Sequence, residues 1–526
     1  MSVETDSIAQ PAPESSTRGI VGAATILAAG NIASRVLGLG REIVIYDLFG
    51  ATGYVSVLKV ASTLVITLYD FLVGGLITAA LVPVLSEYAA DPSRRREFWN
   101  LVSTVLSVIA LLLALAVLGL ELLAEPLFVI LGAGYDEQLR AVGVQMIRLI
   151  LPAVFFIGMA GVLSGVLFAL KNFTLPAFIT AAFNLSIIVC ALALTPVLGI
   201  TSAVLGVVVG AASQVVLQAI GLRNASLRVR FDLRHPALKQ IGRLYVPVLG
   251  GLTIALIGVA IDRNLTSRTG DQSLAWMQAA TYLVQLPLGL VTTAISFAIL
   301  PTLSRAGNAA EFRKLLAFGL KLVLLLILPA VVGLFVLATP VVELVFQHGA
   351  FTASDTAATA RALQFYLFGT AFAAIDQPLV FAFYARKNTL LPNLVAVVAL
   401  GIYLVVAFAL IQPLGYLGLV LANSAQLAGH AVVMLWFTRT RLGGIGGEGV
   451  GTTTLKLLLA SAAMGAAMFF VPPLDFASGV VLEIGRVLVP ALLGGIVYVI
   501  VLKVLRVREL DQLVGVLQRR ARRGRG

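Results

Sequence analysis

Apolar runs of 18 or more residues recur along almost the whole chain, and they constrain its fold more than any other feature. A run of that length is enough for one helix to cross the hydrocarbon core of a bilayer. Hydrophobic residues make up 59% of the 526 residues and charged residues only 12%, which excludes an ordinary soluble protein. The sequence therefore predicts an all-α polytopic membrane protein.

The positions of these runs predict fourteen membrane spans. An even number of spans places both termini on the same side of the membrane. The expected spans are 19–46, 55–85, 101–124, 142–170, 175–195, 199–221, 244–265, 275–303, 315–338, 358–385, 391–411, 415–437, 455–472 and 484–505.

The connections between the predicted spans separate by charge. Arg and Lys collect on one side, for example in 94–96 and 223–243, whereas Asp136 and Asp271 lie on the other side. The positive-inside rule makes the basic side cytoplasmic, so we expect a multi-pass membrane protein with both termini inside. The basic segment Gln518–Gly526 is then expected to lie against anionic lipid. This distribution explains the net charge of +12 better than nucleic-acid binding does.

The chain contains an internal repeat. LFALKNFTLP (Leu167–Pro176) resembles FYARKNTLLP (Phe383–Pro392), 216 residues later. ALVPVLSE (Ala80–Glu87) resembles AILPTLSR (Ala298–Arg305), 218 residues later. The common offset covers six predicted spans, an even number, so the two copies have the same orientation and form parallel repeats.

The repeat predicts two six-helix bundles followed by two C-terminal helices. Transporters built from such repeats bind their substrate between the bundles, which makes transport an expectation by analogy. The predicted parts are a disordered cytoplasmic tail (1–18), bundles at 19–221 and 244–437, a cytoplasmic linker (222–243), a helix pair (455–505) and a basic cytoplasmic tail (506–526).

One apolar stretch, Asn31–Ala51, carries charges that lipid does not tolerate. On a helical wheel its polar and small residues share an arc of roughly 120°. A charge at the centre of a membrane helix costs about 2.5–3.5 kcal/mol, so this arc should face water or protein. It forms either the wall of an anion-binding cavity or a salt-bridge stripe between helices. The residues that matter are Ser34, Arg35, Gly38, Arg41 and Glu42.

Other ionisable residues inside predicted spans are further candidates. Asp262 and Arg263 either face the first cluster across a cavity or pair at the outer end of their span. Asp70 is either a helix-packing carboxylate, a partner of the first-span arginines or a ligand of a coupling ion. Asp376 precedes a proline and either lines a pathway or makes an interior hydrogen bond. Lys59 is expected to extend to the outer surface.

The sequence lacks the residues that several classes of chemistry require. There is no nucleotide-binding loop of the Walker type, no Ser–His–Asp set, and the three histidines form no zinc motif. Cys190 is the only cysteine, so a disulfide is excluded. We therefore expect a carrier without a cofactor or metal, not an enzyme; a coupling ion stays open.

Several motifs resemble those of the MurJ/MviN family of lipid II flippases, within the multidrug/oligosaccharidyl-lipid/polysaccharide exporter superfamily. The resemblance runs over about residues 25–440. The motifs are SRVLGLGRE (Ser34–Glu42), FGA (Phe49–Ala51), VPVLSEY (Val82–Tyr88), IDR (Ile261–Arg263), QLPLGL (Gln285–Leu290), LPTLS (Leu300–Ser304), FQHGAFTASDT (Phe346–Thr356) and FYARKNTLLP (Phe383–Pro392).

This resemblance implies export of an undecaprenyl-pyrophosphate-linked peptidoglycan precursor across a bacterial plasma membrane by alternating access, and contact with cell-wall synthesis proteins. It implies that Arg35 and Arg41 bind the pyrophosphate and that Arg263 assists. Three positions depart from the family pattern. The chain has Ser56 where the family commonly has Asp, no arginine near Tyr69, and Tyr282 where the family often has arginine.

Two rival functions remain at the level of the sequence. A cation-coupled multidrug antiporter, or a flippase for another lipid-linked oligosaccharide, would share the architecture. The antiporter would need an acidic cavity, which the cationic first span disfavours. A non-transporting membrane scaffold for cell-wall enzymes is the third possibility.

Overall fold

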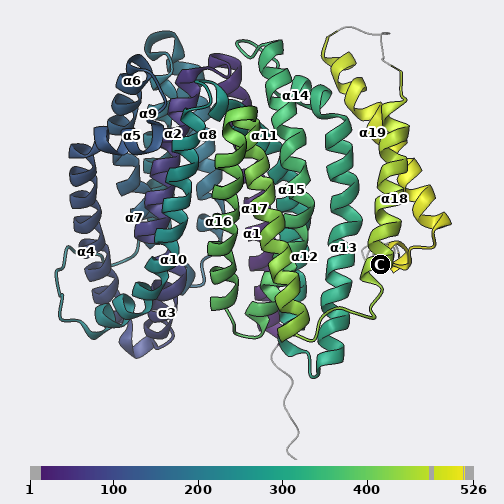
Figure 1. The fold of residues 1–526 in the computed structure, drawn as a ribbon. Helices are drawn as coiled ribbons and strands as arrows, with labels where there is room; N and C mark the ends of the chain where they lie inside the picture. The colour runs from purple at the N-terminus through teal and green to yellow at the C-terminus, as the bar shows by residue number, and fades with distance from the viewer. Residues whose placement is uncertain (1–13, 473–478, 513–514, 516–526) are drawn as a thin grey trace, which may run out of the picture. The chain divides into compact units, whose positions relative to one another are not determined.

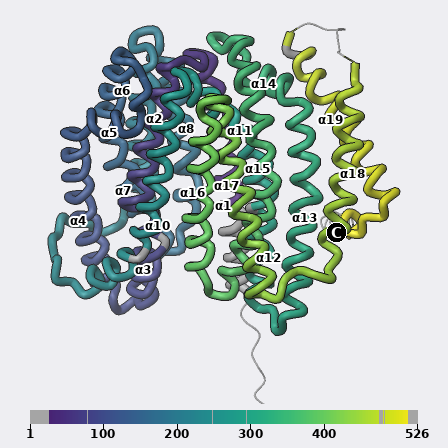
Figure 2. Tube along the Cα trace, in the orientation of Figure 1, coloured from purple at the N-terminus to yellow at the C-terminus, as the bar shows by residue number. Residues whose placement is uncertain are grey.

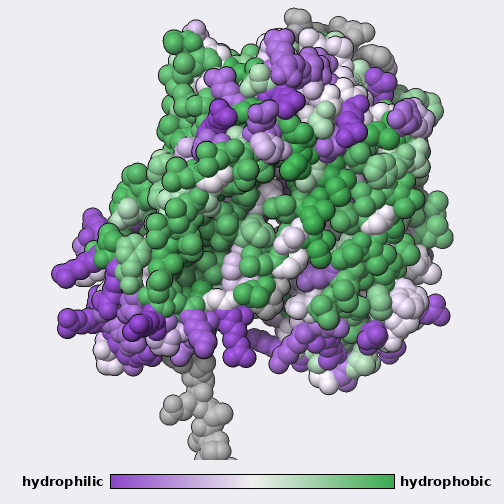
Figure 3. Space-filling view, turned by 60° about the vertical axis from the view of Figure 1, so that its left-hand side comes forward, coloured by the Kyte–Doolittle hydropathy of each residue, from purple (hydrophilic) through white to green (hydrophobic). Residues whose placement is uncertain are grey.

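The computed structural model describes residues 14–472, 479–512 and 515, and within these residues it contains helices and no strand. Thirteen helices of the described part are long and apolar enough to cross a membrane. The first predicted span, α1 (Glu14–Phe49), is a further long helix that carries Arg35, Arg41 and Glu42. The predicted all-α membrane fold is confirmed. Hydrophobic side chains cover most of the middle of the face in Figure 3, and hydrophilic ones gather toward its ends.

Contacts between residues group the chain into two compact units. Figures 1 and 2 colour the chain by residue number, so the segments of each unit can be located in them. Unit 1 comprises residues up to 45, 61–127 and 143–256, and unit 2 comprises 46–60, 128–142 and the chain from 257 onward. This grouping differs from the predicted bundles, because two short segments of the first half pack with the second half. The bundles at 19–221 and 244–437 stay a prediction.

Unit 1 is held together by close helix packing. Its helices are most of α1, α4 (Arg95–Leu122), α7 (Pro152–Ala169), α8 (Thr174–Leu198), α9 (Thr201–Gly221) and the first part of α10 (Pro236–Ser267). Gly206 and Gly210 let α9 approach α8 closely, since an added Cβ would lie 2.8–2.9 Å from the α8 backbone. The buried Gln218 side chain donates to the carbonyl of Ala160 at 2.7 Å and accepts from Ser164 at 2.8 Å. Small residues and interhelical hydrogen bonds are the usual means of packing membrane helices.

Unit 2 contains the remaining long helices: α11 (Ser273–Pro287), α12 (Thr293–Arg305), α13 (Ala309–Val336), α15 (Ala353–Ala385), α16 (Leu390–Leu414), α17 (Tyr416–Arg441), α18 (Val450–Phe469) and α19 (Val480–Val504), with the short α5 (Ala124–Gly132), α6 (Glu137–Ile150) and α14 (Ala338–Phe346). Of these short helices, α5 and α6 each lie partly in unit 1. The predicted C-terminal pair is α18 and α19, which lie side by side in Figure 1. Tyr498 of α19 donates to the carbonyl of Leu325 at 2.8 Å. Lys321 of α13 pairs with Glu509 at 3.1 Å.

The second and eighth predicted spans are not single α-helices. The π-helical segments η1 (Asp70–Gly74) and η2 (Ile77–Leu81) separate α2 (Gly53–Tyr69) from α3 (Val82–Ala89). The π-helical segment η4 (Leu288–Thr292) separates α11 from α12. Asp70 and Leu288 are 218 residues apart, which is one offset of the sequence repeat. The two copies therefore share this distortion.

The turns that follow the fourth and tenth spans also repeat in detail. Lys171 and Lys387 both have φ of 59°, an unusual value for a residue with a side chain. The next amide donates to a carbonyl five residues back in both copies, from Asn172 to Leu167 at 2.8 Å and from Asn388 to Phe383 at 3.0 Å. The repeat predicted from the sequence thus extends to the backbone conformation.

The terminal segments differ partly from expectation. Helix α1 begins at Glu14, so residues 14–18, predicted to be disordered, are helical. The helix of the first span extends toward the N-terminus into polar sequence, because no proline or capping residue ends it there. Residues 508–512 are also helical within the predicted basic tail. Residues 1–13 and the basic segment 518–526 lie outside the described residues.

Gly415, which follows the last residue of α16, has an unusual backbone conformation. Its φ of 57° and ψ of −133° lie in a region that essentially only glycine adopts, and an added Cβ would meet no atom within 4 Å. We therefore expect Gly415→Ala to cost about 1–3 kcal/mol through backbone strain alone. Thermal unfolding in detergent measures this loss.

Gly401 provides the matched control, because it lies inside α16 and an added Cβ there also meets nothing within 4 Å. Gly401→Ala should leave stability unchanged or raise it by up to about 1 kcal/mol. Equal unfolding temperatures for the two variants would contradict the strained conformation at Gly415.

Candidate functional site

Two charged residues of α1, Arg41 and Glu42, form a bonded network with Asn184 of α8. Arg41 donates through Nε at 3.1 Å and through Nη2 at 2.7 Å to the same oxygen of Glu42. Its Nη1 donates to Oδ1 of Asn184 at 3.0 Å. The Glu42 side chain is fully buried and that of Arg41 is 17% exposed. The guanidinium therefore neutralises a carboxylate that water does not reach.

Gly38 makes room for this network. The Asn184 side chain also donates to the carbonyl of Ser34 at 3.1 Å, and a Cβ on Gly38 would lie 3.5 Å from the Asn184 amide nitrogen. The space predicted beside the glycine is thus occupied by an asparagine from another helix. Asn184 was not identified from the sequence; an amide in the middle of an apolar span was the available signal.

Arg35 behaves differently from Arg41. It makes no hydrogen bond and no ion pair with any residue that the structure describes, and its side chain is partly exposed. The polar arc of α1 therefore separates into a bonded part around Arg41 and a cation at Arg35 with free donors. The salt-bridge interpretation fits Arg41, and the anion-binding interpretation fits Arg35.

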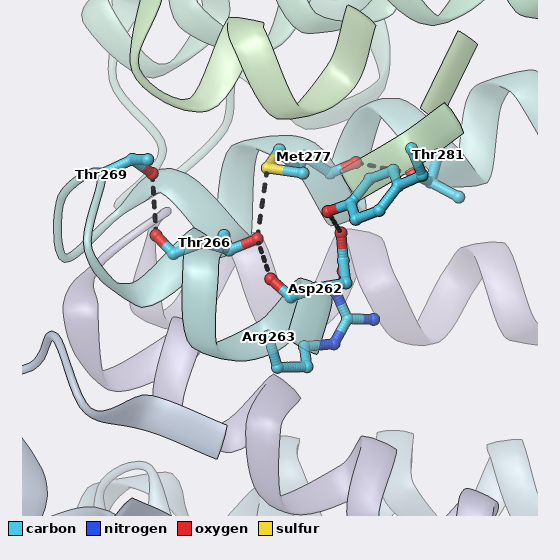
Figure 4. Close-up of polar contacts among 7 residues, drawn as sticks. Asp262, Arg263, Thr266, Thr269, Met277 and Thr281 are labelled. Atoms are coloured by element: carbon cyan, nitrogen blue, oxygen red, sulfur yellow. Dashed lines mark hydrogen bonds and ion pairs between the residues drawn. The ribbon is translucent and has the colours of Figure 1, made fainter. Parts of the chain in front are cut away.

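A second network lies in unit 2, where α10 carries Asp262 and Arg263 (Figure 4). Arg263 Nη1 donates to Oδ2 of Asp262 at 3.1 Å, and Tyr403 of α16 donates to Oδ1 at 2.7 Å. The hydroxyl of Thr266 donates a hydrogen bond to the backbone carbonyl of Asp262 at 2.7 Å. Asp262 and Arg263 form the pair that the sequence left as one of two alternatives. Their predicted position opposite the first cluster stays a prediction.

Lys59 is buried, which contradicts the expectation that it extends to the outer surface. Only 7% of the residue is exposed. Its ammonium nitrogen lies 5.5 Å from the ring centroid of Tyr46 and 5.9 Å from that of Tyr282. Two aromatic faces stabilise a desolvated cation, and this compensation is not visible in the sequence around Lys59.

Segment 46–60 packs against the motif FQHGAFTASDT (346–356) within unit 2. The Tyr46 ring contacts Phe346 and Phe351 edge-on, with centroids 5.2 and 5.5 Å apart. The amide of Ala350 donates to the carbonyl of Asp47 at 2.8 Å. A Cβ on Gly349 would lie 2.3 Å from that carbonyl oxygen, so glycine is required here.

The end of this motif begins α15. Thr352 and Asp355 form a reciprocal capping box, and Trp276 donates to the other oxygen of Asp355 at 2.9 Å. This motif, one of those that carry the family resemblance, therefore acts in packing and helix capping.

The two remaining candidates are Asp70 and Asp376. Asp70 is exposed at the start of η1 and makes no hydrogen bond or ion pair within the described residues, so its expected pairing with Arg35 or Arg41 is not made. Asp376 of α15 lies 2.7 Å from Nδ1 of His430 in α17. This interior hydrogen bond is one of the two alternatives for Asp376. No group of metal-binding side chains occurs in the described part of the chain.

The network predicts a structural role for Arg41. In Arg41→Ala the buried Glu42 carboxylate loses its ion pair with Arg41, and breaking a buried ion pair costs about 3–5 kcal/mol. We expect a lower unfolding temperature and a lower yield of folded protein. Adding Glu42→Gln removes the buried carboxylate charge and should restore part of the loss.

Arg35→Ala is the matched control, with the same substitution in the same helix. It removes no hydrogen bond and no ion pair to a described residue, and it should unfold near the wild-type temperature. An Arg41→Ala variant as stable as Arg35→Ala would show that the network does not support the fold.

The sequence of this chain is similar to those of known proteins. The chain is 30% identical over 425 residues to the lipid II flippase MurJ of Burkholderia cenocepacia, covering 78% of this chain and 81% of that protein. It is 28% identical to the probable lipid II flippase MurJ of Bdellovibrio bacteriovorus, covering 85% of this chain and 87% of that protein.

Two solved structures share the fold. One is described as lipid II flippase MurJ in an inward closed conformation, with a TM-score of 0.80, 23% identity, and coverage of 93% of this chain and all of that chain. A multidrug resistance MATE family transporter in an inward-facing conformation has a TM-score of 0.64 and 15% identity, and covers 78% of this chain and 94% of its own. The family model "Lipid II flippase MurJ" matches residues 45–487. The chain therefore belongs to the MurJ family.

Proposed function

We propose that this protein is a flippase that moves lipid II, a polyprenyl-pyrophosphate-linked peptidoglycan precursor, from the inner to the outer leaflet by alternating access. The observation that carries the proposal is Arg35, a partly exposed cation within a membrane helix with donors free of any described partner. Membership of the MurJ family supplies the substrate class.

Arg35 has the chemistry that a pyrophosphate requires. A guanidinium presents several donors in one plane, which match two phosphate oxygens at once. Arg41 supports this arrangement without binding directly, because its donors hold Glu42 and Asn184 and thereby anchor α1 against α8. Ser34 and Gly38 belong to the same anchor through Asn184.

Arg41 and Arg263 have positioning roles in this proposal, because Arg41 is paired with Glu42 and Arg263 with Asp262. Tyr282, at the position where the family often has arginine, lies beside the buried Lys59, with 5.9 Å between the ammonium nitrogen and the ring centroid.

Flipping also needs a source of energy. We propose a coupling ion, whose candidate sites are the intramembrane carboxylates Asp262 and Asp376, paired with Arg263 and His430 respectively. Paired ionisable groups inside spans commonly mark ion pathways.

The basic segment 518–526 is proposed to bind anionic lipid of the inner leaflet, and cell-wall synthesis proteins are the proposed protein partners.

Arg35 variants test the anion site. Hydrogen bonds to charged groups contribute about 1.5–3 kcal/mol each, so Arg35→Ala should weaken substrate binding about 10-fold or more and sharply reduce flipping. Arg35→Lys keeps the charge but loses the planar fork, and it should be intermediate. Exposure of lipid II at the outer surface measures flipping.

The control is Arg95→Ala, at the exposed first residue of α4, which should flip like wild type. Normal flipping by Arg35→Ala, together with loss of flipping in Asp70→Ala or Asp262→Ala, would overturn the anion site and favour a cation antiporter. Complementation of a flippase-depleted bacterium by the wild-type chain tests the function as a whole. Viability without exposed lipid II would point to a scaffold.

The proposed orientation is tested by cysteine labelling. The background is Cys190→Ala, because Cys190 is the only native thiol. An impermeant reagent should label cysteines placed at Asp136 or Ser354 from outside, and should not reach cysteines at Arg95, Arg230 or Arg386. The opposite pattern would reverse the orientation.

A further inference from the structure

An apolar groove of about 750 Å³ lies in unit 1, between η1, α4 and the first part of α10. Its walls include Leu72, Val108, Leu112 and Tyr245. The groove opens to the surface of the unit, because two of its lining residues are largely exposed, Leu112 at 59% and Leu233 at 71%. Neither the α1 network nor the cluster around Asp262 contributes a residue to the groove.

We propose that this groove binds one inner-leaflet anionic phospholipid, with an acyl chain along α10 and the phosphate at Lys239. Lys239 is the only charged residue that lines the groove, and it is exposed in the first turn of α10. Every other lining side chain is apolar except Tyr245, whose hydroxyl donates to the carbonyl of Phe71 and is thereby satisfied.

The length of the groove fits one leaflet. From Lys239 to Leu249 the lining residues follow ten residues of α10, which is about 15 Å of helix. The hydrocarbon core of a bilayer is about 30 Å thick, so half of it corresponds to one acyl chain of one leaflet. The placement in the inner leaflet rests on the proposed orientation.

The charge around Lys239 fits an anionic head group. The linker that precedes α10 carries exposed Arg228 and Arg234, and also Arg230, which pairs with Asp232 at 3.5 Å. Its backbone is attached to α4, because the amides of Arg228 and Arg230 donate to the hydroxyls of Ser103 and Ser107 at 3.2 and 3.0 Å. The structure thus places a basic segment along the same helix that forms the apolar wall. Cations near the membrane surface attract anionic lipids with about fivefold preference per charge.

Photocrosslinking tests the proposal on the full chain in nanodiscs of phosphatidylcholine. The probe is phosphatidylglycerol with a diazirine on its acyl chain, and the crosslinked peptides are mapped by mass spectrometry. We expect crosslinks concentrated on the lining residues of η1, α4 and α10. Unlabelled phosphatidylglycerol should compete about fivefold better than phosphatidylcholine.

Two matched pairs of variants locate the site. Gly242 lines the groove and an added Cβ there meets nothing within 4 Å, so Gly242→Trp can fill the groove without moving the backbone. It should reduce groove crosslinking about 10-fold. Gly250 of the same helix has equally open surroundings and does not line the groove, so Gly250→Trp should change nothing. Lys239→Gln should abolish the preference for phosphatidylglycerol, whereas Arg243→Gln should keep it.

Other results would overturn the proposal. Crosslinks spread evenly over lipid-facing helices, and unchanged by Gly242→Trp, would mean only ordinary bilayer contact. Competition by a polyprenyl phosphate at concentrations where phosphatidylglycerol fails would assign the groove to the substrate's tail. Crosslinking does not depend on flipping, so its outcome is independent of the experiments on Arg35.

Discussion

The absence of water in the hydrocarbon core is the constraint on which this structure depends. Each backbone amide and carbonyl must find a partner inside its own segment, which makes every described span helical. The same constraint applies to side chains. Glu42 is fully buried and is paired with Arg41, and Asp262 is paired with Arg263 and Tyr403. Arg35 stands out because no described residue satisfies it in this way.

Much of the fold could be predicted from the sequence because hydrophobicity and repetition act over long stretches. The apolar runs located the helices, and the matched segments 167–176 and 383–392 revealed a duplication that the backbone reproduces down to the φ of Lys171 and Lys387. The grouping of segment 46–60 with unit 2 could not be predicted, since it depends on contacts with residues some 300 positions away.

The candidate site was predicted less completely, because a helical wheel gives the face of a residue and not its partner. It placed Arg35 and Arg41 on one arc, but only Arg41 reaches Asn184 and only its side chain folds back on Glu42. Lys59 shows the same limit. Its position near the end of a span suggested contact with water, whereas two tyrosines, one of them more than 200 residues away, cover it.

The π-helical segments at Asp70–Gly74 and Leu288–Thr292 occupy equivalent places in the two copies of the sequence repeat. A π turn accommodates one more residue than an α turn, is rare and is frequently found at functional sites. Both spans are therefore interrupted at a corresponding point, and in the first copy the interruption begins at the exposed carboxylate of Asp70.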